Sequence, residues 1–316
     1  MGCGEAGPVL LVVVGPTAVG KSDFALRVCE RFGGEILSVD SMQVYRGLDR
    51  GTAKPDAATR RRVPHHGIDL ADPGHDFSLG EFVRAAETAI AGIAGRGRLP
   101  VLVGGTGLYL RGLLKGIIDA PPRDESLRAR MAQRARAHGP AYLHRLLQRV
   151  DAEAARRLPS NDRQKLVRAL EVRFLARRGL SDIIRETPFG PDRYRSVKVG
   201  LSMNRQALYR RIDERVMSIF AAGLLDEIRR LRASGVPDGA NALKALGYRE
   251  ALRHLRGEIT LPQAIELAQR NTRRYAKRQW TWFRKETEIA WFELDPSRED
   301  RFREPMEHAA RRLGRR

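Results

Sequence analysis

The sequence predicts an α/β fold in which a parallel sheet is flanked by helices and a mostly helical segment is inserted into the chain. Three observations support this prediction. An apolar run from Val9 to Val14 leads into a glycine-containing loop and then into a helical pattern. A second apolar run, Val101 to Val103, ends in glycines, and alternating apolar residues return at 197–201 after a long arginine-rich stretch. Buried strands separated by helical segments are typical of a parallel sheet.

The first loop is the strongest functional signal in the chain. It matches the pattern G-x-x-x-x-G-K-[ST] at every fixed position, and it lies between a strand and a helix as that pattern requires. The loop consists of Gly15, Pro16, Thr17, Ala18, Val19, Gly20, Lys21 and Ser22. The backbone N–H groups of such a loop surround an anion at a helix N-terminus, while Lys21 adds positive charge and Ser22 offers a hydroxyl to Mg²⁺. The loop predicts a site for a phosphate compound without identifying the compound.

The helix after the loop carries apolar residues at helical spacing, and we expect it to stop at Gly33-Gly34. A second strand then runs from Glu35 to Val39 and ends at Asp40. An acidic residue at the carboxyl end of a strand lies where open α/β sheets bind ligands, which makes Asp40 a candidate site residue. On spacing alone, a turn-forming Asp-Ser pair explains Asp40 equally well.

The strand that contains Val101 to Val103 runs into Gly104-Gly105-Thr106-Gly107. An NTP hydrolase often places a Mg²⁺-binding Asp at this point, and here there is none. Glycine lets a ligand approach the backbone closely, and Thr106 can donate a hydrogen bond to a phosphate or leaving-group oxygen. ATP is therefore disfavoured, although Asp40 could replace the missing Asp.

Several shorter signals complete the first part of the chain. Ser78 opens a capping-box pattern that predicts a helix, and Gly51–Pro55 reads as a loop. The basic run Arg60–Arg62 is expected to be solvated. Adjacent side chains such as His65 and His66 point in different directions, so we weigh against a metal site there.

The character of the chain changes from about Asp119, where Pro121-Pro122 marks a boundary. Residues 124–180 read as helical, with Ser160 expected to cap a helix that buries Leu166, Leu170 and Phe174. We predict a first core segment at 1–118, a helical insertion at 119–196, and a second core segment at 197–316.

The second core segment is predicted to be largely helical after Asn204, with a helix junction in 243–249. Thr260 opens a second capping-box pattern and a long helix rich in Arg and Lys. Its aromatic residues are expected to lie largely in the core, and its basic residues largely toward a partner. We expect a last strand at 289–294 and a mobile tail ending at Arg315-Arg316.

Composition narrows the class of partner. Lys and Arg number 58 against 38 acidic residues, which gives a formal charge of +20. Together with the phosphate loop, this excess favours nucleic acid over a merely solvated basic surface. The only cysteines are Cys3 and Cys29, so neither a zinc site nor a disulfide framework is indicated. We find no signal peptide and no run long enough to span a membrane, and we expect a cytoplasmic protein that is a monomer.

The ordered set of motifs resembles one family, the tRNA dimethylallyltransferases of bacterial type. The motifs are GPTAVGKS, DSMQVY, GTAKP, HHGID, VGGTGLY, NDRQKLVRALE, LGYRE and RNTRRYAKRQWTWFR, within about residues 9–290. The resemblance implies a P-loop NTPase-like core and a helical insertion that grips the anticodon stem-loop of tRNA. It implies transfer of a dimethylallyl group from dimethylallyl diphosphate to N6 of the adenosine 3′-adjacent to the anticodon. The C-terminal zinc finger of the eukaryotic members is absent from this sequence.

The resemblance also assigns residues. It implies Asp40 as the general base, and Thr106 and Arg128 as contacts to tRNA and the reacting centre. On chemical grounds we expect Lys21, Mg²⁺ on Ser22, the loop amides and Arg128 to neutralise the diphosphate. The family's stretches of tRNA contact correspond here to Asp40, Ser41, Met42, Gln43, Gln164, Lys165, Leu166, Val167, Arg168, Lys244, Ala245, Leu246, Gly247, Tyr248, Arg249, Lys277, Arg278, Gln279, Trp280, Thr281, Trp282, Phe283 and Arg284.

The chemistry of prenyl transfer to adenine is consistent with these residue roles. Adenine N6 is a weak nucleophile, so attack on the allylic carbon requires a neutralised diphosphate leaving group and a base for the N6 proton. A base in a stack must be extruded, which costs least in a single-stranded loop. The alternatives are a small-molecule kinase that uses ATP and an RNA-binding module with a structural anion site. A kinase needs no +20 charge, and an RNA-binding module needs no Asp40 and Thr106 around a phosphate loop.

Overall fold

A computed structural model of the chain describes residues 7–117, 120–139, 141–186, 190–286 and 288–315. The chain forms two compact units. Unit 1 comprises Met1–Leu114 and Asp192–Arg316, and unit 2 comprises Lys115–Pro191. Both boundaries of the inserted unit lie a few residues earlier than the 119–196 expected from the sequence.

Unit 1 is built on a six-stranded sheet in the order β3-β2-β4-β1-β5-β6, and every pair of neighbouring strands is parallel. The strands are β1 (Leu10–Val14), β2 (Gly34–Val39), β3 (His65–His66), β4 (Leu99–Gly104), β5 (Ser196–Ser202) and β6 (Ile289–Glu293). The predicted parallel α/β core is thus confirmed, and among the described residues the two-residue edge strand β3 is the one strand that the sequence analysis did not predict. Because all strands run the same way, the ends of β1, β2 and β4 bring the phosphate loop, Asp40 and the glycine turn to one edge.

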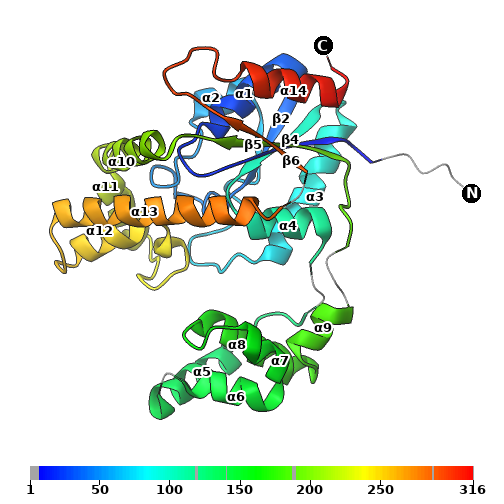
Figure 1. The fold of residues 1–316 in the computed structure, drawn as a ribbon. Coiled ribbons are helices and arrows are strands. Elements are labelled where there is room, and N and C mark those ends of the chain that lie inside the picture. Colours follow the sequence, from blue (N-terminus) through cyan, green and yellow to red (C-terminus); the bar gives the residue numbers. More distant parts are fainter. Residues whose placement is uncertain (1–6, 118–119, 140, 187–189, 287, 316) are drawn as a thin grey trace, which may run out of the picture. The chain divides into compact units, whose positions relative to one another are not determined.

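Helices cover both faces of the sheet (Figure 1), and the alternation of side chains along β1 explains why. Leu11 and Val13 pack in one core with α1 (Lys21–Phe32) and α14 (Arg303–Leu313). Leu10, Val12 and Val14 pack in the other core with α3 (Leu79–Gly95) and α4 (Gly107–Lys115). The central strands are therefore buried on both sides, as a parallel sheet requires.

The expected mobile tail is wrong for residues up to Leu313, because the last helix α14 is part of the core. Met306 and Ala309 are buried with the residues of the first core, and Phe302 contacts Phe24 with ring centroids 5.6 Å apart. The sequence signal was weak because charged residues alternate with these apolar ones in a short segment.

A helical subdomain follows β5 in unit 1 and forms a third core. Its helices are α10 (Arg205–Ala221), α11 (Leu224–Ala233), the 3₁₀ turn η1 (Ala242–Lys244), α12 (Tyr248–Leu255) and α13 (Leu261–Phe283). The predicted junction lies between η1 and α12, and Gly247 is the N-cap of α12. The capping boxes at Ser78 and Thr260 are both present, so these helix starts are confirmed.

The basic run Arg60–Arg62 lies in a short helix, α2 (Ala57–Arg62), which the sequence analysis did not predict. Arg60 is not simply solvated, since it forms an ion pair with Asp69 at 2.9 Å. His66 bonds to Glu35, and Nδ1 of His65 lies 2.7 Å from the Val63 carbonyl oxygen.

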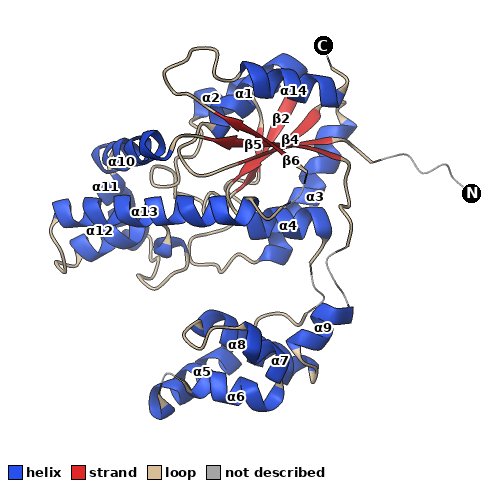
Figure 2. Cartoon of the chain, viewed as in Figure 1, coloured by secondary structure: helices blue, strands red, loops and turns tan. Residues whose placement is uncertain are grey.

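Unit 2 consists of helices, as Figure 2 shows for its described residues. They are α5 (Glu125–His138), α6 (Tyr142–Val150), α7 (Ala152–Arg157), α8 (Arg163–Ala176) and α9 (Leu180–Glu186). The expected cap of α8 is wrong, because the side chain of Asp162 rather than Ser160 accepts from the Lys165 N–H. Leu166 and Leu170 are buried, but Phe174 is 45% exposed. No helix in the described parts of the chain is long and apolar enough to cross a membrane.

Candidate functional site

The phosphate loop is shaped by backbone constraints at two glycines. Gly15 has φ +142°, and a Cβ on it would lie 2.3 Å from the carbonyl oxygen of Leu201 on β5. Gly20 has φ +106° and is the N-cap of α1. Side chains rarely adopt such φ values, so glycine lets the chain turn from β1 into α1 directly against the neighbouring strand.

Lys21 folds back over this loop. Its Nζ donates to the carbonyl oxygens of Gly15 at 2.9 Å and Pro16 at 2.8 Å. Burial, and after it the positive charge of Arg215, lowers the pKa of Lys21 to about 7, while the carboxylate of Asp40 opposes both effects. An anion bound in the loop would stabilise the protonated form of Lys21 and so raise its pKa.

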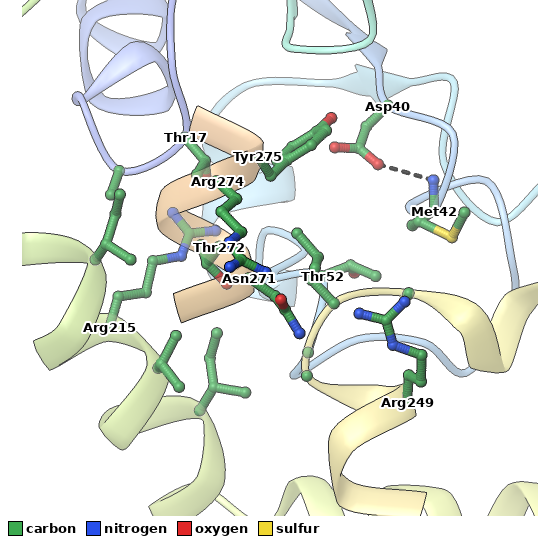
Figure 3. A pocket seen from close by; sticks show the side chains of 18 of the residues that line it. Thr17, Asp40, Met42, Thr52, Arg215, Arg249, Asn271, Thr272, Arg274 and Tyr275 are labelled. Atoms are coloured by element: carbon green, nitrogen blue, oxygen red, sulfur yellow. Dashed lines mark hydrogen bonds between the residues drawn. The ribbon is translucent and has the colours of Figure 1, made fainter. Parts of the chain in front are cut away.

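Asp40 lies at the end of β2 with its carboxylate held by the following turn. Its Oδ1 accepts from the Met42 N–H at 2.8 Å (Figure 3) and also from the Gln43 N–H at 3.3 Å. The end of β4 packs closely beside it, since a Cβ on Gly104 would lie 2.1 Å from the Val39 carbonyl oxygen. The two hydrogen bonds fix the direction of the carboxylate, and the close packing of Gly104 on Val39 fixes the strand end that carries it.

Thr106 belongs to the same edge but has a supporting position. Its Oγ1 accepts from the Ser41 N–H at 3.2 Å, and its own N–H donates to Val39. The Tyr275 hydroxyl interacts with Thr106, and burial raises the pKa of Tyr275 to about 12. Thr106 lines neither of the two pockets described next.

Two pockets meet at Asp40. The first, of about 560 Å³, contains the phosphate loop residues Gly20, Lys21 and Ser22. The second, of about 530 Å³, lies between the start of α12, α10 and α13 (Figure 3). The residues that line both pockets are Thr17, Ala18, Asp40, Thr52, Arg215 and Tyr275. Their arrangement places the Asp40 carboxylate between the anion loop and a separate recess.

The second pocket has an apolar side and a basic side. The apolar side includes Ile212, Val216 and Phe220 from α10. The basic residues that line it are Arg215, Lys244, Arg249, Arg274 and Arg278, and Asn271 lies among them. Such a recess suits a flat heterocycle attached to a phosphate backbone.

A buried carboxylate orients part of the basic side. Glu250 is 2% exposed and accepts from Arg249 at 2.8 Å and from Asn271 Nδ2 at 2.8 Å. The same side chain accepts the Gly247 N–H at 2.9 Å and so caps α12. One carboxylate, that of Glu250, therefore holds both the N-terminus of α12 and the side chains of Arg249 and Asn271 in the pocket.

Arg211 and Arg215 were missed by the sequence analysis. They lie one turn apart on α10 and line the first pocket, where Arg211 Nε donates to the Ala18 carbonyl at 3.1 Å. Their four-residue spacing was the available signal. It was not specific, because the same helix also carries Arg205 and Arg210.

The residues expected to contact tRNA differ in exposure, and those that are neither exposed nor buried are Asp40, Ser41, Met42, Gln43, Thr106, Arg128, Arg168, Leu246, Trp280 and Trp282. The exposed group is Gln164, Lys165, Lys244, Arg249, Lys277, Arg278, Thr281 and Arg284, and the buried group is Leu166, Val167, Ala245, Gly247, Tyr248, Gln279 and Phe283. Tyr248 shows what the buried side chains do, since its hydroxyl donates to the buried Glu227. The buried members support the surface that the exposed members form. The expected division on α13 is only partly confirmed, because Trp280 and Trp282 are half-buried.

In unit 2, Arg128 and Arg168 share one carboxylate. Glu171 is fully buried and accepts from Arg128 at 2.7 Å, from Arg168 at 2.7 Å and from the Asp124 N–H at 2.8 Å. Burial acts to raise the pKa of Glu171, but these hydrogen bonds outweigh it and hold the pKa at about 2. The arrangement presents two oriented guanidinium groups within this unit.

Comparison with known proteins identifies relatives over nearly the whole chain. Residues 43–286 match the family model described as IPP transferase. The chain is 48% identical to the tRNA dimethylallyltransferase of Geobacter metallireducens over 284 residues, which cover 90% of this chain and 92% of the relative. It is 48% identical to that of Symbiobacterium thermophilum over 287 residues, covering 90% and 89% of the two chains.

Solved structures give the same result for the fold. The tRNA isopentenylpyrophosphate transferase of Bacillus halodurans is 38% identical, with a TM-score of 0.70 and 97% of each chain covered. A eukaryotic dimethylallyltransferase, solved acting on tRNA, is 24% identical with a TM-score of 0.81. The match covers 98% of this chain and 81% of the eukaryotic chain, and it shows that the two proteins share a fold.

Proposed function

The chain belongs to the IPP transferase family, and we propose that it transfers a dimethylallyl group from dimethylallyl diphosphate to N6 of the adenosine 3′-adjacent to a tRNA anticodon. It is a tRNA-prenylating transferase, as its relatives are named. The observation that carries the detailed proposal is the position of Asp40, which lines both the pocket with the phosphate loop and the pocket with the apolar and basic sides.

The first pocket suits the donor. The loop amides, Lys21 and Arg215 provide positive potential for a diphosphate, and the first pocket of about 560 Å³ can hold it with its short prenyl chain. Ser22 is exposed in the same pocket, so its hydroxyl fits as one oxygen ligand of Mg²⁺. When bound, Mg²⁺ would neutralise charge on the leaving diphosphate.

The second pocket suits the acceptor. An adenine extruded from the anticodon loop would lie against α10, with its N6 toward Asp40. The N6 lone pair forms a bond to C1 of the dimethylallyl group, the C1–oxygen bond breaks, and its electron pair leaves with the diphosphate. The N6 proton passes to the Asp40 carboxylate, whose direction is set by the Met42 N–H.

The test supplies the protein with Mg²⁺, unmodified tRNA and dimethylallyl diphosphate labelled in the prenyl group. We expect label in tRNA, at the adenosine beside the anticodon after nuclease digestion and mass analysis. A matched tRNA with guanosine at that position is the control and should stay unlabelled. Absence of label together with turnover of ATP on a small acceptor would instead support the kinase alternative.

A further inference from the structure

Gln279 is a buried polar side chain that connects two segments of the site. It lies on α13 and is 5% exposed. Its Oε1 accepts from the N–H of Thr17 in the phosphate loop at 2.8 Å, and its Nε2 donates to the carbonyl oxygen of Gly105 after β4 at 3.1 Å. One amide group therefore joins the loop after β1 to the loop after β4, although the three residues are far apart in sequence.

The neighbourhood is shaped to receive this amide. A Cβ on Gly105 would lie 1.8 Å from Gln279 Nε2, so any side chain at that position displaces it. The Tyr275 hydroxyl, one turn earlier on α13, also interacts with Gln279 and with Thr106. The two residues next to Gln279 in the sequence are less buried than Gln279, since Arg278 is exposed and Trp280 is half-buried.

We propose that Gln279 is a positioning residue that sets the distance between the donor loop and the Gly105–Thr106 turn. The inference rests on the proposed function, because it assumes that the loop holds the diphosphate. Both ends of the bridge belong to groups that determine where the reaction occurs: Thr17 lines both pockets, and Thr106 holds the Ser41 N–H next to Asp40. Loss of the bridge lets the two segments move apart while the chemical groups remain present.

This role differs from the direct tRNA contact expected for Gln279 from the sequence. Gln279 lines the first pocket, but both the Oε1 and the Nε2 of its amide are bonded within unit 1, and its side chain is only 5% exposed. Exposed cations such as Lys277 and Arg278 lie on the same helix. Binding of RNA to these cations would thus act on the helix that also carries the bridge to the donor loop.

The test compares Gln279→Met, which keeps side-chain length without hydrogen bonds, with Gln269→Met on the same helix. Gln269 donates to the Asp213 carbonyl at 3.2 Å and lines neither pocket. For Gln279→Met we expect KM for dimethylallyl diphosphate to rise about tenfold and kcat to fall, with the tRNA Kd within about twofold of wild type. Gln269→Met should leave all three constants within about twofold. The positioning role is contradicted if the two variants have equal kinetic constants, or if tRNA binding falls as much as donor binding.

A second variant covers the possibility that Gln279→Met does not fold. Gly105→Ala retains Gln279 but forces its amide away, and Gly105 has no positive φ that would strain the backbone. We expect the same rise in KM as for Gln279→Met, and a double variant no worse than either single one, because both remove the same bridge. Additive effects would overturn the proposal.

Lys21→Ala measured in parallel separates this inference from the proposed function. If Lys21→Ala leaves KM for dimethylallyl diphosphate unchanged, the donor role of the loop fails and the inference fails with it. If Lys21→Ala raises KM while both bridge variants do not, the donor role stands and the positioning role alone is rejected.

Discussion

Ser41 and Thr106 join the ends of two neighbouring strands, since the Ser41 N–H donates to Thr106 Oγ1 across a 3.2 Å hydrogen bond. This contact fixes the turn in which Met42 and Gln43 hold the carboxylate of Asp40. The geometry of the proposed base is therefore set by the backbone N–H groups that follow it and by the Thr106 hydroxyl that holds their turn. Side-chain changes that preserve these backbone contacts should change chemistry without changing the fold.

Asp40→Asn tests the base directly. The amide oxygen can still accept from the Met42 N–H, so we expect normal folding and a tRNA Kd within about twofold of wild type. Removal of a general base lowers kcat by about 10²- to 10⁴-fold. Single-turnover transfer at saturating tRNA measures this, and Asp226→Asn, at an exposed position on α11 that lines neither pocket, is the matched control. A small loss of rate with a large loss of tRNA binding would contradict the assignment.

Lys21 gives a pH dependence with a definite sign. Its pKa in the free protein is lowered to about 7, and a bound diphosphate should raise it. Above that pKa the free protein lacks the proton that the complex holds, so donor binding takes up a proton and weakens as pH rises. Calorimetric titration with diphosphate at about pH 8, in buffers of different ionisation enthalpy, should show uptake of up to about one more proton for wild type than for Lys21→Ala. Equal uptake by both proteins would refute this.

The exposed cations of α13 should control tRNA affinity through charge. Lys277→Gln on α13 and Arg284→Gln at its C-cap each remove one exposed positive charge. We expect weaker tRNA binding and a salt slope reduced by about one for each phosphate that is no longer neutralised, with little effect on KM for the donor. Arg229→Gln on α11, where Arg229 pairs with Asp226, is the control for net charge. A salt slope that does not differ from the control would place the tRNA elsewhere.

We expect the stability of unit 2 to depend on pH because of the buried Glu171. Its pKa is held at about 2, below the usual 4.5, so its contribution to stability is present above about pH 4.5 and is lost as pH falls toward 2. Glu171→Gln should destabilise this unit at neutral pH by about 1 to 3 kcal/mol, because Arg128 and Arg168 lose their shared acid. Urea unfolding at neutral and acid pH measures both effects. Glu125→Gln, on an exposed side chain, should change neither.

Tyr248→Phe separates core support from RNA contact at the start of α12. The variant removes the hydroxyl that donates to the buried Glu227, whose carboxylate also accepts from the Arg50 N–H at 2.9 Å. We expect a loss of about 1 to 3 kcal/mol in the free energy of unfolding and an unchanged tRNA Kd. Tyr209→Phe, on a half-buried residue of α10, is the control. Reduced tRNA affinity with unchanged stability would restore the direct contact expected from the sequence.

The sequence predicted the parallel core because its signals are local. The phosphate loop, the apolar strands and both capping boxes depend on residues within one or two turns of each other. Arg211 and Gln279 could not be assigned in the same way, because what distinguishes them is contact with Ala18, Thr17 and Gly105 across the fold. The helix α14 escaped detection for a related reason, since its burial depends on Phe24 and the sheet.

The order of the strands has a consequence for how the protein is made. The central strand β1 pairs with β4 and with β5, and β5 begins at Ser196, after the whole of unit 2. A ribosome releases the N-terminal strand first, yet one side of that strand has no partner until about 190 residues have followed. The helices of unit 2 can complete their own core during this interval. The phosphate loop packs against Leu201, so it can reach its final conformation only late in synthesis. Until then the edge of β1 is exposed, and a chaperone would be most useful during this interval.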